Sequence, residues 1–284
     1  MSTVDAPGIP RYDLNDGTSL PRIGFGTSDL LGDAAAAAVR SALETGYRLL
    51  DSAVNYENEA DVGRALQESG VPREQVQVTT KIPGRFHQHD LAVRCVEDSL
   101  RAMQLDYLDL CLIHWPNPSV GLYIEAWQAL VDVRERGLVR SIGVSNFTAK
   151  HLVDIIDATG VTPAVNQIEL HPYFPQEQMR QVDADSGIVT ESWSPLGKRR
   201  PPFAEPAVVA PADFHGVSPA QVILRWQVQL GALPLPKSAT PARQHENLDI
   251  FGFELADDEV AAITALGRPD GRLFGGDPDV HEEM

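Results

Sequence analysis

Four side chains in the first part of the chain carry groups that together could transfer a proton to a carbonyl oxygen. They are a carboxylate, a phenol, an ammonium and an imidazole, on Asp51, Tyr56, Lys81 and His114. The pKa of a Tyr side chain, about 10, is too high for a good acid at neutral pH, and a nearby ammonium lowers it by stabilising the phenolate. We therefore expect Asp51 to hold Lys81 in place and Lys81 to lower the pKa of Tyr56. His114 is expected to hold the carbonyl oxygen.

This set of groups can donate a proton to a developing alkoxide but supplies no electrons, so it predicts a hydride carrier as cofactor. The segment PKSATPARQHEN (236–247) places Lys237, Ser238 and Arg243 in one loop that leads into a helix. A helix N-terminus with these side chains suits a phosphate group. An Arg and a Lys together favour the 2′-phosphate of NADPH over the free hydroxyl of NADH. An ordinary basic surface loop is the alternative.

A Gly-rich dinucleotide loop is not predicted in this sequence. The segment Gly24-Phe25-Gly26 lacks that pattern, because position 29 is Asp and no helix opens there. A dinucleotide must therefore bind by another route. Trp193, at the end of a predicted strand, could stack on a nicotinamide ring, and core packing is the alternative for this side chain.

An alternation of strands and helices predicts the scaffold that brings these side chains together. Apolar, strand-like runs occur at 22–26, 47–51, 76–81, 107–114, 139–146, 164–170, 188–194 and 232–237. Helical runs lie between them, at 33–45, 58–69, 90–103, 121–136, 148–158, 176–185 and 218–229. Alternation over this length, typically about 250 residues, favours a closed (β/α)8 barrel, an α/β fold, over an open doubly wound sheet. Since no linker divides it, we expect one domain over residues 1–284.

Other segments frame the predicted barrel. Asp16-Gly17 lies between short alternating runs and predicts a β-hairpin cap before the first barrel strand. Asp33 is a candidate N-cap of the first helix, and Gly46 is expected to end it. The Pro-rich segment 198–211 is interpreted as an excursion between the seventh strand and its helix. The tail GRLFGGDPDVHEEM (271–284) has no periodicity, so it either lies over the barrel mouth or is loose.

Barrels of this kind carry their chemistry at the C-terminal ends of the strands. The predicted strands from the second to the eighth end at or near Asp51, Lys81, His114, Ser145 with Asn146, Gln167, Trp193 and Lys237. Each residue alone has an ordinary explanation, because an Asp often caps a helix, a Lys is often a solvated rim charge and a His is often a core residue. Their convergence on one rim favours a single active site, with Tyr56 in the loop that follows Asp51.

The composition narrows the class of protein. A balance of 23 basic and 40 acidic residues gives a charge of −17, which repels nucleic acid and anionic lipid and is usual for a cytoplasmic protein. Cys95 and Cys111 lie in apolar runs, which predicts buried thiols and a reducing compartment. The N-terminal MSTVDAPGIP lacks the basic and apolar regions of an export signal, and no stretch has the roughly 18 apolar residues of a membrane span.

Several segments resemble motifs of the aldo-keto reductases, in the order in which that family has them. They are GYRLLDSAVNYENEADVG (46–63), HWP (114–116), GVSNF (143–147) and PKSATPARQHEN (236–247). SPLG (194–197) and ENLDIF (246–251) look most similar to the bacterial branch of 2,5-diketo-gluconate reductases and prostaglandin F synthase-like enzymes. The resemblance covers essentially the whole chain. It implies a monomeric enzyme on a (β/α)8 barrel that uses NADPH to reduce aldehydes and ketones to alcohols.

The resemblance also implies roles for individual residues. The family's catalytic tetrad falls on Asp51, Tyr56, Lys81 and His114, with Tyr56 as the acid. Its nicotinamide site falls on Ser145, Asn146, Gln167 and Trp193. Its pyrophosphate loop falls on Ser194, Leu196 and Gly197. Its 2′-phosphate and adenine sites fall on Lys237, Ser238, Arg243, Glu246 and Asn247. The walls of the substrate pocket are expected at Phe25, Trp115 and Phe274.

Two segments depart from the family pattern. Ser28-Asp29-Leu30 stand where many relatives have an aromatic residue soon after the GFGT segment, which would leave that wall of the pocket more open or more polar. Residues 198–202 (KRRPP) stand where a shorter, Gly-bearing loop is expected over the pyrophosphate. Both departures concern the substrate and the cofactor loop rather than the proton transfer.

Two functions of other classes stay open on the sequence alone. A redox-sensing regulatory protein on the same barrel would bind NADPH with little turnover, and NADPH oxidation with a panel of aldehydes separates it from an enzyme. A metal-dependent hydrolase would draw on His87, His89, His114 and His171. The chain lacks the His pair in the first strand that such hydrolases generally use, so no metal is expected.

Overall fold

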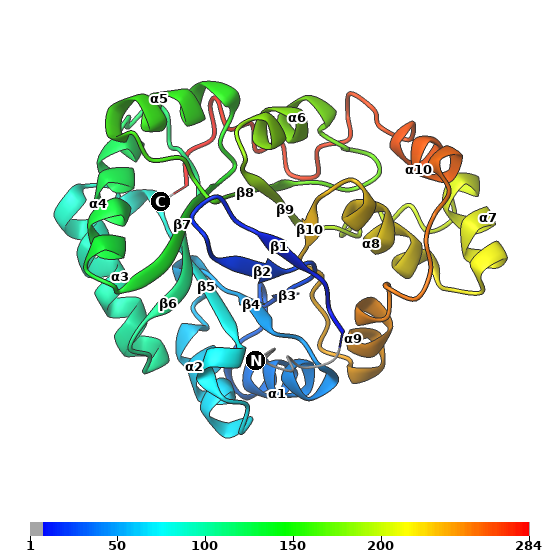
Figure 1. Cartoon of the computed structure of the whole chain (residues 1–284), viewed down its shortest axis with the longest axis horizontal. Coiled ribbons are helices and arrows are strands. Elements are labelled where there is room, and N and C mark those ends of the chain that lie inside the picture. The colour runs from blue at the N-terminus through cyan, green and yellow to red at the C-terminus, as the bar shows by residue number, and fades with distance from the viewer. Residues whose placement is uncertain (1–7, 284) are drawn as a thin grey trace.

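The computed structural model describes residues 8–283 as a barrel of parallel strands surrounded by helices (Figure 1). The strands follow one another round the sheet in chain order, from β3 to β10. Their bounds are β3 (Phe25–Gly26), β4 (Leu49–Asp51), β5 (Gln77–Ile82), β6 (Leu108–Ile113), β7 (Val139–Ser145), β8 (Val165–Glu169), β9 (Val189–Trp193) and β10 (Leu233–Pro234). Each lies within one of the predicted strand runs, except that β5 extends one residue beyond its run, to Ile82, and the pattern confirms the (β/α)8 prediction.

Two backbone hydrogen bonds close the barrel between its first and last strands. The amides of Gly24 and Gly26 donate to the carbonyl oxygens of Pro234 and Pro236, at 3.0 and 3.1 Å. Close approach of the backbone favours glycine at position 26, because a Cβ on Gly26 would lie 2.9 Å from the backbone oxygen of Leu235. The segment Gly24-Phe25-Gly26, which lacks the pattern of a dinucleotide loop, therefore serves closure of the sheet.

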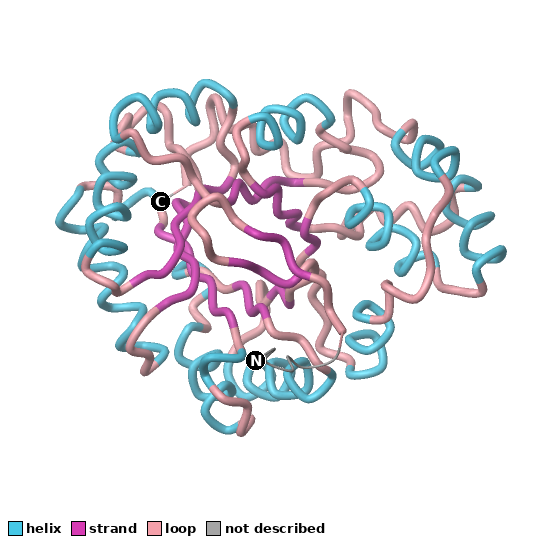
Figure 2. Tube along the Cα trace, viewed as in Figure 1, coloured by secondary structure: helices cyan, strands magenta, loops and turns pink. Residues whose placement is uncertain are grey.

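Helices cover the outside of the barrel, as the ring of cyan coils around the magenta strands in Figure 2 shows. The helices of the strand–helix units are α1 (Gly32–Thr45), α2 (Glu59–Glu68), α3 (His89–Met103), α4 (Tyr123–Glu135), α5 (Ala149–Thr159), α6 (Glu177–Asp185), α8 (Pro219–Gln229) and α9 (Pro241–Leu248). Further helices are α7 (Pro206–His215) and α10 (Asp257–Thr264), and short 3₁₀ turns are η1 (Val54–Tyr56), η2 (Arg73–Gln75) and η3 (Gly84–Phe86). α7 packs against α8 and α10.

The predicted hairpin is present and caps one end of the barrel. β1 (Arg11–Asp13) pairs antiparallel with β2 (Ser19–Pro21), and Gly17 in the turn has a φ of 84°. The hairpin lies across the barrel opening in Figure 1. Asp16 accepts a hydrogen bond from Ser141 Oγ at 2.6 Å, close to the start of β7. The hairpin thus closes the N-terminal end, which leaves the C-terminal end for chemistry.

Alternation along the strands explains why a carboxylate follows a buried run. Successive side chains of a strand point to opposite faces. Leu50 packs in the cluster between the strands and the helices, whereas Leu49 packs with Leu20 of the hairpin and Leu112 of β6 in the barrel interior. Asp51 is two residues after Leu49, so its side chain points to the same face, toward the barrel interior, at the C-terminal end of β4.

One local expectation about boundaries is wrong and another is confirmed. Helix α1 begins at Gly32 with Leu31 as its N-cap, so Asp33 is not the N-cap but lies in the first turn, where its charge still suits the helix dipole. The segment 198–211 is an excursion between β9 and α8, as expected, and its last part belongs to α7, which starts at Pro206 and includes Pro211. A proline at the first helical position already has the backbone angle that a helix needs and has no amide to leave unpaired. Gly46 ends α1 as expected.

Candidate active site

Lys81 lies at the centre of the candidate site, held on three sides. Its Nζ donates to both carboxylate oxygens of Asp51 at 2.8 Å and to the backbone oxygen of Ser52 at 2.8 Å. The phenolic oxygen of Tyr56 lies 3.4 Å from the same nitrogen. Lys81 is 0% exposed and Asp51 is 4% exposed, so water screens this ion pair very little. The predicted order of contacts, from carboxylate to ammonium to phenol, is present.

Neighbouring strands and one short turn deliver these groups. Asp51 ends β4, Lys81 is the second-last residue of β5, and these strands are paired in the sheet. Tyr56 ends the 3₁₀ turn η1 just after β4, which returns its ring over the barrel. His114 directly follows β6, and its ring lies edge-on to that of Tyr56 with 5.8 Å between ring centroids. Parallel strands present their C-terminal ends on one rim, so the topology brings the groups together.

Burial has a larger effect on the electrostatics of this site than the sequence indicated. Lys81 lowers the pKa of Tyr56 through its charge and its hydrogen bond, as expected, but burial raises the same pKa by more. The pKa of Tyr56 therefore lies above its ordinary value, because the loss of water outweighs the ammonium. Burial alone would lower the pKa of Lys81, but the adjacent carboxylate of Asp51 raises it above its usual range. The ammonium and the phenol are thus both protonated at neutral pH.

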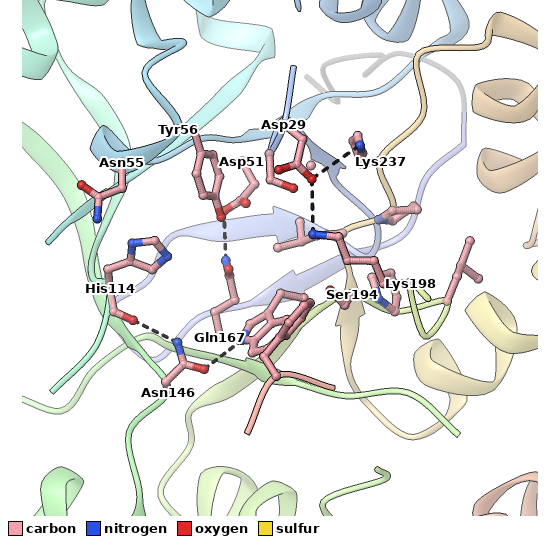
Figure 3. A pocket seen from close by; sticks show the side chains of 18 of the residues that line it. Asp29, Asp51, Asn55, Tyr56, His114, Asn146, Gln167, Ser194, Lys198 and Lys237 are labelled. Carbon is pink, nitrogen blue, oxygen red and sulfur yellow. Dashed lines mark hydrogen bonds and ion pairs between the residues drawn. The ribbon is translucent and has the colours of Figure 1, made fainter. Parts of the chain in front are cut away.

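A cavity of about 540 Å³ opens beside these groups (Figure 3). The predicted site residues that line it are Asp51, Tyr56, His114, Trp115, Asn146, Gln167, Trp193, Ser194, Leu196, Lys237 and Phe274. The tail lies over the barrel mouth, as one of the two alternatives predicted, because the ring of Phe274 lies 5.8 Å from that of Trp193. The cavity therefore has an aromatic wall on one side and the proton-donating groups on the other.

Side chains at the C-terminal ends of β7 and β9 form a hydrogen-bonded network beside the cavity. Asn146 Nδ2 donates to the backbone oxygen of His114 at 3.0 Å, and Trp193 Nε1 donates to Asn146 Oδ1 at 2.8 Å. Ser145 Oγ donates to the backbone oxygen of Gln167 at 2.8 Å. Asn146 holds a φ of 61°, a left-handed conformation that Asn tolerates better than most residues. These bonds fix the orientation of the side chains expected to meet a carboxamide.

Several predicted residues lie elsewhere. Phe25 is 1% exposed and packs edge-on against Tyr47 in the core, so its assignment to the substrate pocket is corrected. Neighbouring residues of a strand face opposite sides, so Gly26 rather than Phe25 lines the cavity. Other residues predicted to bind the cofactor also lie outside the cavity lining. They are Gly197, Ser238, Arg243, Glu246 and Asn247. Arg243 is exposed at the start of α9, beyond the cavity-lining Lys237.

The two departures from the family pattern meet across the cavity. Asp29 Oδ2 lies 3.3 Å from Lys198 Nζ and 3.8 Å from Lys237 Nζ, and all three residues line the cavity (Figure 3). Sequence reasoning noted both segments but did not pair them. The only signal in the sequence was that one departing segment carries an acid and the other a base. Whether such residues form an ion pair depends on whether the fold brings their loops together.

Sequence reasoning also missed Glu191, a buried carboxyl on β9. Gln167 Nε2 donates both to Glu191 Oε2 and to Asp51 Oδ1, each at 2.9 Å, so the two acids share one amide. Burial and the nearby charge of Asp51 raise the pKa of Glu191 to about 8. Its Oε1 is buried without a hydrogen-bond partner among the described residues, as suits a neutral carboxyl group. In the sequence, Glu191 is simply a polar residue inside a strand.

Replacing Glu191 by Gln is expected to stabilise the protein more at high pH than at low pH. The folded protein holds the Glu191 proton up to a pKa of about 8, whereas the ordinary pKa of a Glu side chain is 4.5, so the wild-type free energy of unfolding falls as the pH rises between these two values. Each unit of pKa difference corresponds to about 1.4 kcal/mol. The variant is neutral throughout and avoids this loss.

Melting temperatures measured across that pH window test the expectation. The gap between the Glu191→Gln variant and wild type should widen as the pH rises. The same change at Glu44, which is exposed on α1, serves as the matched control and should leave the gap constant. Parallel curves for Glu191→Gln and wild type would show that the carboxyl is not held neutral by the fold.

The other expectations have mixed outcomes. Cys95 and Cys111 are buried free thiols, as expected. Within residues 8–283, no cluster of three or more His, Cys, Asp or Glu side chains could hold a metal ion, so the candidate histidines do not form a metal centre. His87 is fully buried, and burial lowers its pKa to about 4. In the same part of the chain, no helix has the length and apolar character needed to cross a bilayer.

Comparison with known proteins shows the family to which the chain is similar. The sequence model of the Aldo/keto reductase family matches residues 22–200 and 204–268. The 2,5-diketo-D-gluconic acid reductase B of Corynebacterium sp. (strain SHS752001) is 55% identical over 278 residues, covering 98% of this chain and 100% of that protein. Methylglyoxal reductase DkgA of Escherichia coli (strain K12) is 42% identical over 267 residues, covering 94% and 96%.

Solved structures agree with these sequence matches. The crystal structure of a Gox0644 mutant in complex with NADPH superposes with a TM-score of 0.92 at 42% identity, covering 97% of this chain and 99% of that one. The Bombyx mori aldo-keto reductase in complex with NADP gives a TM-score of 0.87 at 35% identity, covering 93% and 94%. Similarity of sequence and of fold therefore extends over nearly the whole chain.

Proposed function

Because the chain belongs to the aldo/keto reductase family and is an NADP-dependent oxidoreductase, we propose that it reduces a small carbonyl compound to an alcohol with Tyr56 as the proton donor. The observation that carries the proposal is the position of Lys81. Its buried ammonium contacts both oxygens of Asp51 and lies 3.4 Å from the Tyr56 hydroxyl, which lines the cavity.

The residues around the cavity fit an NADPH molecule. Trp193 offers a ring face beside Asn146 and Gln167, whose amide groups can pair with a carboxamide. Ser194 has a φ of 50°, which turns the chain sharply after β9 toward Gly197. Lys237 and the exposed Arg243 stand before and within the first turn of α9, where positive charge and a helix N-terminus suit a phosphate. We assign these residues to the nicotinamide, pyrophosphate and 2′-phosphate, in that order.

The chain's own residues carry out the proton transfer. His114 and Tyr56 line one wall of the cavity and are proposed to hold the carbonyl oxygen between them. NADPH, when bound, supplies the hydride that the protein's side chains cannot. As negative charge develops on the oxygen, Tyr56 donates its proton to it, and Lys81 stabilises the phenolate that remains. Asp51 keeps the ammonium charged and fixed in position.

A kinetic screen tests the proposal directly. Loss of NADPH absorbance is measured with sugar ketones, aromatic aldehydes and dicarbonyl compounds, the last because relatives are named for 2,5-diketo-D-gluconic acid and methylglyoxal. We expect turnover with at least one class. Tight NADPH binding without turnover of any member would instead favour the redox-sensing role, in which the barrel binds the cofactor and signals to a partner.

Replacing Arg243 by Ala is expected to weaken NADPH binding roughly 10-fold or more and to leave NADH binding nearly unchanged, because a hydrogen bond to a charged group contributes about 1.5–3 kcal/mol. Only NADPH carries the 2′-phosphate that the guanidinium would contact. Fluorescence titration with both cofactors provides the measurement. Arg94→Ala, which removes another exposed arginine on α3, is the control. Equal weakening of NADPH and NADH binding would contradict the assignment of the 2′-phosphate to Arg243.

We also propose that the chain works as a single-domain monomer in the cytoplasm. The barrel closes on itself through the amides of Gly24 and Gly26, and its free thiols are buried as a reducing compartment allows. Light scattering after size-exclusion chromatography should give the mass of one chain, about 31.0 kDa. A mass of two or more chains would contradict the monomer.

A further inference from the structure

The tail that crosses the barrel mouth delivers a carboxylate to His114. Glu283 Oε1 lies 2.9 Å from His114 Nδ1 and accepts a hydrogen bond from Asn55 Nδ2 at 2.7 Å. Both partners of the close pair are largely buried, with side chains 12% exposed for His114 and 16% for Glu283. Neither Asn55 nor Glu283 was singled out by sequence reasoning. A contact with the side chain that is proposed to hold the substrate oxygen calls for a chemical explanation.

Hydrogen bonds and close backbone contacts hold the end of the tail in one position. Glu283 N donates to Asn117 Oδ1 at 3.2 Å, and Asn117 Nδ2 donates back to the backbone oxygen of Glu283. Glu282 Oε1 accepts from the Ser119 amide at 2.8 Å. Gly84 faces the same tail segment, and a Cβ on Gly84 would lie 2.2 Å from the backbone oxygen of Glu283. Contacts on both sides of the backbone therefore fix where the Glu283 side chain points.

The carboxylate reaches the imidazole from outside the cavity. Asn55 and His114 line the cavity, whereas Glu283 does not. The ring of His281 packs on that of Trp115 with 4.2 Å between centroids, so the tail passes behind this wall. The side of the His114 ring that faces the cavity is consequently left available to a substrate.

The charge on Glu283 suits this contact. Burial by itself raises the pKa of Glu283, but His114 and the hydrogen bond from Asn55 lower it below its ordinary value. Glu283 is therefore a carboxylate at neutral pH. A carboxylate beside one ring nitrogen of a histidine holds a proton on that nitrogen and fixes the ring orientation, which determines what the other nitrogen can do.

We propose that Glu283 is a positioning residue for the reduction: it pairs with His114 Nδ1 and thereby aims the Nε2 proton of the same ring at the carbonyl oxygen in the cavity. This inference rests on the proposed function, in which His114 holds that oxygen. A histidine ring with a proton on each nitrogen can donate from Nδ1 toward a carboxylate and from Nε2 toward a substrate oxygen at the same time. Glu283 acts through the His114 ring and does not itself line the cavity.

The test compares three variants of the full chain by steady-state kinetics with a carbonyl compound that the wild type reduces. Glu283→Ala is expected to lower kcat by about 10-fold, the size typical of losing a partner that orients a functional histidine. Its Kd for NADPH should stay within about twofold of wild type, because the tail contact lies away from the cofactor residues. Glu283→Gln keeps an acceptor oxygen without the charge and should have an intermediate kcat.

Glu282→Ala is the matched control. It removes a carboxylate from the same tail, and with it the contact to the Ser119 amide, without touching His114. Its kcat should stay within about twofold of wild type. If Glu283 only anchored the tail, the two alanine variants would be slowed equally or would change only KM. Either result overturns the proposal, as would a kcat for Glu283→Ala equal to or above wild type.

A double-mutant cycle with His114→Ala shows whether the effect passes through the imidazole. Once the ring is absent, Glu283→Ala should cause no further loss of kcat. An undiminished loss in that background would contradict the proposal. Failure of the proposed function has a different signature: turnover that survives Tyr56→Phe would refute the proton donor, whereas full activity of Glu283→Ala beside an inactive Tyr56→Phe refutes only the role of Glu283.

Discussion

Replacing Tyr56 by Phe is expected to lower carbonyl reduction by about 10²-fold or more while leaving NADPH binding nearly unchanged. The change removes one oxygen, 3.4 Å from Lys81 Nζ, and leaves the ring that lies edge-on to His114. The cavity therefore keeps its shape and loses its acid. The measurements are kcat for the carbonyl compound and the Kd of NADPH by fluorescence titration.

The control for this variant is Tyr12→Phe. Tyr12 lies on the hairpin at the opposite end of the barrel, where its hydroxyl donates to backbone oxygens of Val228 and Ala232 at 3.2 and 3.3 Å. Losing those bonds can affect stability but should not slow reduction. Because burial raises the pKa of Tyr56, its ionisation should not slow reduction near neutral pH. Near-normal turnover in Tyr56→Phe would show that another group donates the proton.

Replacing Lys81 by Met is expected to abolish most activity and also to destabilise the fold by about 3–5 kcal/mol, the usual cost of removing one partner of a buried ion pair. Asp51 is 4% exposed and would lose a bond to each of its oxygens. The remaining hydrogen bond from Gln167 cannot compensate a buried charge. Chemical denaturation measures the stability, and NADPH oxidation measures the activity.

The double variant Lys81→Met with Asp51→Asn separates the two effects. A neutral amide at position 51 can still accept from Gln167 Nε2, so most of the lost stability should return. Activity should not return, because no ammonium then stabilises the phenolate of Tyr56. Wild-type stability in the single variant would contradict the buried ion pair. Wild-type turnover in the double variant would contradict the role of the ammonium.

The sequence predicted the scaffold and the four central groups because both depend on local patterns. Apolar runs alternating with helical runs indicate parallel strands wherever they occur, and residues such as Asp51 and Lys81 stand out as charges at the end of such runs. In a parallel barrel all of these ends meet on one rim. A one-dimensional pattern therefore carried the information about which side chains converge.

Other parts of the site could not be predicted in this way. Phe25 was assigned to the substrate pocket. Because side chains alternate along β3, its ring instead packs in the core against Tyr47. In the sequence, Glu191 is only a polar residue within a strand. The structure shows that it is buried beside Gln167 and shares the amide of that residue with Asp51. The pKa of Tyr56 depends on how much water reaches the phenol, which no spacing of residues reveals.

By itself, the sequence determined the barrel, the order of its strands and the carboxylate, ammonium, phenol and imidazole on its rim, because strand periodicity and the closure of parallel strands leave few alternatives. Tertiary structure alone decided what surrounds those groups. The pairing of Asp29 with Lys198 and of Glu283 with His114 joins segments far apart in the chain through loops whose paths depend on packing. Distances across such loops arise only when the whole chain has folded.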